Sequence, residues 1–125
     1  MRKGRGVSVR SRASSRVVLV GPLASPTLIR RVVRSPDPVI AVDGGLAPCL
    51  KARVPVALAI GDWDSLRDRR SLAAIDHVTL SPDKDESDLA AALRFARLWM
   101  PKAEILCLGV TGGDPDHHVA ALLDQ

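Results

Sequence analysis

The 125-residue sequence contains no tyrosine and only three other aromatic residues, Trp63, Phe95 and Trp99. Proteins that hold single-stranded nucleic acid commonly stack its bases on aromatic side chains, so this shortage argues against such a partner. Long apolar runs are missing as well. None approaches the roughly 20 residues that a membrane span requires, and Val17–Val20 is too short for the apolar core of a secretory signal. We therefore expect neither nucleic acid nor a membrane as a partner.

Cysteine is also scarce, because the sequence contains only Cys49 and Cys107. They are far apart and lack the spacing of metal ligands or of a redox motif. Each lies in an apolar stretch, where a free cysteine behaves as a small hydrophobic side chain. We expect both thiols to be buried and reduced, as in a cytoplasmic protein.

Negative charge is absent from residues 1–16, which hold six basic side chains (Arg2, Lys3, Arg5, Arg10, Arg12 and Arg16). The rest of the chain has 12 basic and 14 acidic residues, so the formal net charge of +4 belongs to this segment. Its Arg, Ser and Gly content predicts a disordered tail, followed by one domain over residues 17–125. The tail is interpreted as a solvated leader; contact with nucleic acid or an anionic membrane, or a transit peptide, is the alternative.

Short apolar, β-branched runs predict strands at residues 17–20, 38–42, 56–60, 77–80 and 104–108. Helical patterns lie between them, at residues 25–33, 46–52, 66–75 and 87–100, and a last helix is predicted from near Asp116, carrying Val119, Leu122 and Leu123. Strands that are apolar on both faces and alternate with helices indicate an α/β fold. We expect three layers, with a mostly parallel, Rossmann-like sheet covered by helices on both faces.

Aspartates gather where these strands end. Eight of the fourteen acidic residues follow a strand: Asp43, Asp62, Asp64, Asp83, Asp85, Asp88, Asp114 and Asp116. In open parallel sheets, ligands bind just beyond the carboxyl ends of the strands. Carboxylates crowded at one edge repel each other unless a cation joins them, and Mg²⁺ commonly binds one or two carboxylates together with phosphates. The neighbouring glycines let backbone N–H groups approach an anion, so the pattern predicts a site for Mg²⁺ and a polyphosphate.

Several of these residues also have purely structural interpretations. Asp43-Gly44-Gly45 is an ordinary turn sequence, the segment 83–85 suits a solvated loop, and Ser87 is a good helix N-cap. Residues 62–65 (Asp-Trp-Asp-Ser) are harder to explain as structure alone, because two acids at the end of an apolar strand are costly. His117 and His118 would point apart on a helix, which argues against zinc. Residues 109–113 match neither the dinucleotide fingerprint nor the P-loop.

Four segments occur in an order that resembles the catalytic domain of thiamine pyrophosphokinase. They are Ala41-Val42-Asp43-Gly44-Gly45, Gly61-Asp62-Trp63-Asp64-Ser65, Asp83-Lys84-Asp85-Glu86-Ser87-Asp88-Leu89 and Gly112-Gly113-Asp114-Pro115-Asp116-His117. The family pattern is approximately A-x-D-G-G, G-D-[FLW]-D-S, [DE]-[KQ]-D-x-[TS]-D and G-G-R-x-D-H. The resemblance spans roughly residues 17–125.

The resemblance implies transfer of pyrophosphate from ATP to the hydroxyl of thiamine, which gives thiamine diphosphate and AMP. Mg²⁺ is the implied cofactor, with Asp62, Asp64 and Asp88 as its ligands. The implied catalytic residues are these three together with Asp43 and Asp116. The implied nucleotide-binding positions are Gly44, Gly45, Ser65, Lys84, Asp85, Ser87, Thr111, Gly112, Gly113 and His117.

Two departures from the family pattern bear on these expectations. Asp114 stands where the family has arginine, which reverses a charge close to the expected phosphates. Family members continue into a smaller β-sandwich domain that helps form the thiamine pocket and the dimer, whereas this sequence ends at Gln125. We therefore expect the ATP-binding half of the family's architecture, with an exposed sheet edge that would favour a homodimer. The alternatives are a pyrophosphokinase acting on a pterin alcohol, a nucleotide-binding fragment without catalysis, and nucleic-acid binding through the basic tail.

Overall fold

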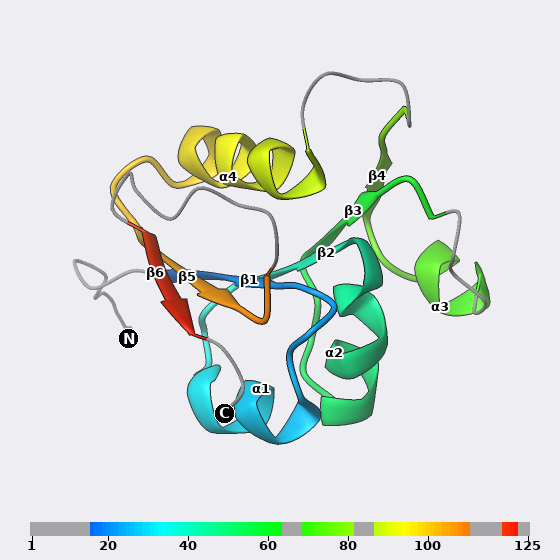
Figure 1. Ribbon diagram of the computed structural model, residues 1–125, viewed down its shortest axis with the longest axis horizontal. Coiled ribbons are helices and arrows are strands. Elements are labelled where there is room, and N and C mark those ends of the chain that lie inside the picture. Colours follow the sequence, from blue (N-terminus) through cyan, green and yellow to red (C-terminus); the bar gives the residue numbers. More distant parts are fainter. Residues whose placement is uncertain (1–15, 64–68, 82–86, 111–118, 123–125) are drawn as a thin grey trace, which may run out of the picture.

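The computed structural model describes residues 16–63, 69–81, 87–110 and 119–122. In these ranges six parallel strands form one sheet in the order β4-β3-β2-β1-β5-β6 (Figure 1). The strands are β1 (Arg16–Val20), β2 (Val39–Val42), β3 (Leu58–Gly61), β4 (His77–Thr79), β5 (Glu104–Leu108) and β6 (Val119–Leu122). The predicted α/β fold with a parallel sheet is confirmed, and each of the five predicted strands overlaps an observed one.

Helices cover the two faces of this sheet (Figure 1). They are α1 (Pro26–Val32), α2 (Leu46–Ala52), α3 (Arg69–Ala73) and α4 (Asp88–Trp99), and a 3₁₀ turn, η1 (Asp43–Gly45), precedes α2. Alternate residues of β1 point to opposite faces. Val18 packs in one cluster with Ile29 of α1, whereas Leu19 packs in another with Ala92 of α4. The first cluster also contains residues of α2 and α3, which confirms the three-layer arrangement.

The core lies along the central strands. Val17–Val20 are completely buried, and the residues of β2 and residues 105–108 of β5 are at most 7% exposed. Because helices cover both faces, these strands are apolar throughout rather than alternating in polarity. In the ranges that the structure describes, no polar or charged side chain is fully buried, and no helix is long and apolar enough to cross a membrane.

Local capping explains where two of the helices begin. The Ser25 side chain accepts a hydrogen bond from the Leu28 backbone N–H at 3.0 Å, and Pro26 occupies the first helical position. Ser87 caps α4 in the same way, because its Oγ accepts from the Ala90 N–H at 3.0 Å. The helix starts predicted at both serines are confirmed. The observed α3, Arg69–Ala73, lies within the predicted helix at 66–75.

The predicted last helix is wrong where it can be compared with the structure. Val119–Leu122 form β6, which pairs in parallel with β5 from Ile105↔Val119 to Leu108↔Leu122. A short apolar run suits a buried strand as well as a helix, and periodicity alone does not separate the two. The free hydrogen-bonding groups along β5 determine the outcome, because a strand placed there satisfies them. The other predicted residues of that helix, Asp116 and Leu123, lie outside the described ranges.

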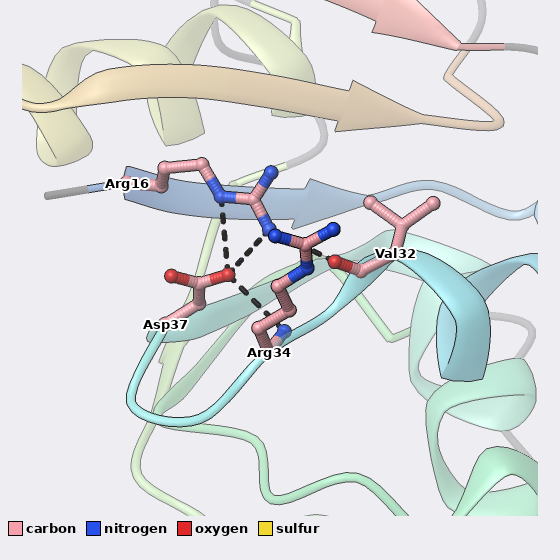
Figure 2. Close-up of polar contacts among 4 residues, drawn as sticks. All are labelled: Arg16, Val32, Arg34 and Asp37. Atoms are coloured by element: carbon pink, nitrogen blue, oxygen red, sulfur yellow. Dashed lines mark hydrogen bonds and ion pairs between the residues drawn. The ribbon is translucent and has the colours of Figure 1, made fainter. Parts of the chain in front are cut away.

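A polar cluster lies at the amino edge of the sheet, where the parallel strand β1 begins (Figure 2). The Arg16 guanidinium donates to Oδ2 of Asp37 through Nε at 3.1 Å and Nη2 at 2.5 Å, and Nη2 also donates to the Val32 carbonyl at 2.8 Å. The Arg34 backbone N–H donates to the same carboxylate oxygen at 3.2 Å. The cluster joins the start of β1 to the connection between α1 and β2. Arg16, which we assigned to the tail, is therefore the first residue of the sheet.

Candidate active site

The candidate site lies where the chain changes direction in the sheet. From β1 the strands run outward to β4, and the chain then crosses back to place β5 on the other side of β1. At such a switch point the loops that follow two neighbouring strands diverge and leave room for a ligand. The loop after β1 rests on the end of β5, because the Gly21 N–H donates to the Leu108 carbonyl at 2.8 Å and the Leu23 N–H to the Gly109 carbonyl at 2.9 Å.

A pocket of about 140 Å³ opens at this point. It is lined by Gly21, Pro22, Val42, Asp43, Ser87, Asp88, Leu89 and Val110. These residues come from the ends of β1, β2 and β5 and from the N-terminus of α4. Pockets for whole small molecules usually measure roughly 300–1,000 Å³, so the described residues enclose only part of such a site.

Asp43 is the first residue after β2 and connects this pocket to the end of β3. Its backbone is left-handed, with φ 50°, a conformation that aspartate tolerates better than most residues. A Cβ atom built on Gly61 would lie 3.3 Å from Oδ1 of Asp43, which places the carboxylate beside the last residue of β3. Asp62 follows directly in the chain and is partly buried. The structure thus places Asp43 at the pocket wall and beside the residue that precedes Asp62.

The two predicted nucleotide-binding glycines of this turn lie in η1. Gly45 is buried, and a Cβ atom there would lie 1.9 Å from the Val20 carbonyl oxygen. The turn therefore packs directly on the end of β1, at a distance that no side chain permits. Gly44 packs beside Pro22, which lines the pocket.

Ser87 and Asp88 form the opposite wall of the pocket, at the start of α4. The cap hydrogen bond supports the structural interpretation of Ser87, and a nucleotide contact by the same side chain stays a prediction. Asp88 is partly buried in the first turn, where the helix dipole favours a negative charge. Asp43 and Asp88 therefore line one pocket from elements that are 45 residues apart in the chain.

The remaining predicted site residues lie outside the described ranges. They are Asp64, Ser65, Lys84, Asp85, Thr111, Gly112, Gly113, Asp116 and His117. Within the ranges that are described, no group of three or more His, Cys, Asp or Glu side chains lies close enough together to hold a metal ion. The predicted set of three aspartate ligands therefore stays a prediction, with two of its members, Asp62 and Asp88, at the carboxyl edge of the sheet.

Sequence reasoning missed several residues of this region. Pro22 and Val110 line the pocket, and the signal available for them was their position after the first and fifth predicted strands. Trp63 lies between the two aspartates of its motif and is only 2% exposed, with a left-handed backbone at φ 66°. Its sequence signal was an apolar residue in a polar turn.

The two cysteines take no part in this site. Cys49 belongs to the cluster under α2 and Cys107 to the cluster under α4. Burial raises the pKa of the Cys49 thiol to about 12 and that of the Cys107 thiol to about 11, because the charged thiolate loses its hydration. Both side chains are buried small hydrophobes, as the sequence predicted, and neither supplies a nucleophile.

Comparison with known proteins gives one consistent family. The model of the thiamin pyrophosphokinase catalytic domain matches residues 29–124, whereas a search of curated proteins gives no match. A crystal structure of a thiamin pyrophosphokinase family protein from Enterococcus faecalis is similar, with 33% identity and a TM-score of 0.64 over 82% of this chain. Thiamin pyrophosphokinase from Geobacillus thermodenitrificans is 26% identical, with a TM-score of 0.62 over 82% of this chain. Thiamine pyrophosphokinase from Bacillus subtilis is 30% identical, with a TM-score of 0.59 over 84% of this chain.

In each of these three comparisons the match covers 50% of the other protein's chain. The chain therefore spans about half the length of these structures. The family match covers most of the sequence. The chain belongs to the thiamin pyrophosphokinase catalytic domain family.

Proposed function

We propose that this chain binds Mg-ATP at the carboxyl edge of its sheet and transfers the pyrophosphoryl group to the hydroxyl of thiamine, which yields thiamine diphosphate and AMP. One observation carries the proposal. In a chain of this family, Asp43 and Asp88 line a single pocket at the switch point of a parallel sheet. Nucleotides bind in this position in many open α/β sheets.

The carboxylates at this edge are of the kind that binds Mg²⁺. Magnesium is usually held by one or two carboxylates, with phosphate oxygens and water completing its shell. Asp88 at the pocket and Asp62 after β3 would hold it, together with Asp64. When bound, Mg²⁺ would neutralise phosphate charge and polarise the phosphorus that is attacked.

The chain itself supplies rigid placement of charge. Attack on phosphorus requires in-line geometry and charge stabilisation more than a covalent nucleophile. Asp43 and Asp62 directly follow β2 and β3, whose residues are buried, so the backbone at these two carboxylates is held by the core. Gly45, packed on the end of β1, lets the turn that carries Asp43 lie close to the pocket.

The acceptor is proposed from the family rather than from a pocket in the described residues. The match covers only 50% of the chain of each of the two thiamin pyrophosphokinases compared above, so a partner chain or a further segment would complete the thiamine site in the proposed enzyme. A homodimer or a separate second domain would serve this purpose equally well.

The first experiment is to measure AMP release from Mg-ATP with and without thiamine. We expect thiamine-dependent AMP that falls about 100-fold or more in Asp62→Asn, because the loss of one charged contact to the transferred group costs that much. Asp76→Asn is the matched control, since it makes the same change at an exposed residue at the opposite, amino end of β4.

Each alternative has its own result in the same assay. AMP release that depends on hydroxymethylpterin and not on thiamine would show that the acceptor is a pterin alcohol. Mg-ATP binding without AMP release would leave a nucleotide-binding module and overturn the proposed transfer. Equal activity of Asp62→Asn and the wild type would refute the site.

A further inference from the structure

Trp63 has an unusual backbone conformation for a bulky residue. Its φ of 66° is left-handed, a conformation that bulky residues rarely adopt and that persists only where the surroundings enforce it. The indole is only 2% exposed, so it is buried and does not reach a ligand in the pocket. Any effect of this ring on the site must therefore act through its neighbours.

The contacts of the indole identify these neighbours. It packs edge-to-face on His77 of β4, with ring centroids 6.4 Å apart and an interplanar angle of 87°. The His77 ring is oriented in turn by its Nδ1, which donates to the Ile75 carbonyl at 2.8 Å. The indole also belongs to the core cluster beneath α2 and α3. These contacts anchor Trp63 on the side of the sheet away from α4.

The same ring closes the space beside Gly61. A Cβ atom built on Gly61 would lie 3.3 Å from Cζ3 of Trp63, 3.0 Å from Cα of Asp43 and 3.3 Å from its Oδ1. The indole and Asp43 therefore both border the end of β3. The last ladder hydrogen bond there runs from the Leu80 N–H to the Gly61 carbonyl, at 2.8 Å, so Asp62 lies just beyond the sheet.

We propose that Trp63 is a positioning residue whose buried indole fixes the turn after β3 and thereby holds the Asp62 and Asp43 carboxylates in place for Mg-nucleotide. This inference rests on the proposed function. Without the ring, no packing contact of the indole stabilises the left-handed backbone at residue 63. The backbone then relaxes, and the neighbouring Asp62 moves with it. A shift of about 1 Å in a metal or phosphate contact is enough to weaken it strongly.

Four variants of the full chain separate the ring from the backbone. Trp63→Ala removes the ring but keeps the left-handed penalty, whereas Trp63→Gly removes both. Trp63→Phe keeps an aromatic ring that can fill most of the same space. Trp99→Ala is the matched control, because Trp99 is 46% exposed and lies on the far face of the sheet, at the end of α4.

The first measurement is hydrogen–deuterium exchange of the ligand-free chain at the Leu80 amide. We expect about tenfold faster exchange in Trp63→Ala and Trp63→Gly, because local opening of the β3 end would expose this bond, with the β1 amides unchanged. Exchange at the wild-type rate in both variants would overturn the proposal. Should Trp63→Ala fail to fold, Trp63→Gly provides the same test without the left-handed penalty.

The second measurement is the affinity for a non-hydrolysable ATP analogue, by calorimetry with and without Mg²⁺. We expect the Mg²⁺-dependent gain in affinity to fall about tenfold in Trp63→Ala, with Trp63→Phe and Trp99→Ala close to the wild type. An equal loss with and without Mg²⁺ would show a merely structural role and overturn the positioning. If the wild-type chain does not bind the analogue, the proposed function fails, and the Leu80 exchange alone decides whether Trp63 holds the turn.

Discussion

Replacing Gly109, which precedes the pocket residue Val110, with alanine should strongly destabilise this chain. Gly109 follows β5 with φ 61°, and a Cβ atom there would lie 2.0 Å from the Ala24 nitrogen and 2.5 Å from its Cα. The left-handed backbone costs a non-glycine residue about 1–2 kcal/mol. Forcing a methyl group into packed backbone typically costs a further amount of about 1–3 kcal/mol.

Together these terms predict a loss of about 2–5 kcal/mol in the free energy of unfolding, a large part of the roughly 5–15 kcal/mol of a typical domain. The loss should reach the site as well. The Gly109 carbonyl accepts from the Leu23 N–H, and the loop that contains this bond supplies Gly21 and Pro22 to the pocket. Moving the backbone at Gly109 away from the loop after β1 would displace Gly21 and Pro22 from the pocket wall.

Urea unfolding followed by tryptophan fluorescence measures the effect. With a slope of about 1–3 kcal/mol per molar urea, we expect the midpoint to fall by about 1 M or more. Gly44→Ala is the control in the same region, because its nearest contact is a Pro22 side-chain carbon at 3.0 Å rather than backbone. Equal midpoints for Gly109→Ala and Gly44→Ala would refute the steric reasoning.

Four further predictions concern the stability of the fold. Arg16→Ala should cost about 1–3 kcal/mol, since it removes the charged partner of a carboxylate that is only 13% exposed, and nucleotide affinity, measured by calorimetry, should not change because the cluster lies at the amino edge. Ser87→Ala should cost about 1 kcal/mol in the same urea assay through the lost cap of α4, and Ser87→Asn should recover most of it. At pH 8 a thiol reagent should label neither Cys49 nor Cys107 in the folded chain but both in urea; rapid labelling without denaturant would contradict their burial. Because burial raises both pKa values above the unfolded value of 9.0, their contribution to stability should be intact below pH 9 and disappear as pH rises towards about 11 to 12, which urea midpoints at several pH values would reveal.

Much of this fold follows from local patterns in the sequence. The apolar run at residues 104–108 and the alternation of strands with helices were enough to predict the parallel sheet, because strands buried on both faces need apolar residues throughout. Ser25 and Ser87 predicted two helix starts, because a cap depends on a hydrogen bond only three residues away. The aspartates after the strands predicted which edge holds the candidate site for the same reason: a residue's place at the end of a strand is a local property.

The rest depended on contacts between distant parts of the chain. The strand order, with β1 between β2 and β5, created the switch point that brings Asp43 and Asp88 to one pocket. Val119–Leu122 became a strand rather than a helix because the edge of β5 offered partners for its backbone. Trp63 has a left-handed backbone and its indole packs on His77 of β4, a contact that no local pattern predicts. Local sequence selects strands and caps, whereas burial and hydrogen bonding between distant segments decide which strands meet and which side chains reach the site.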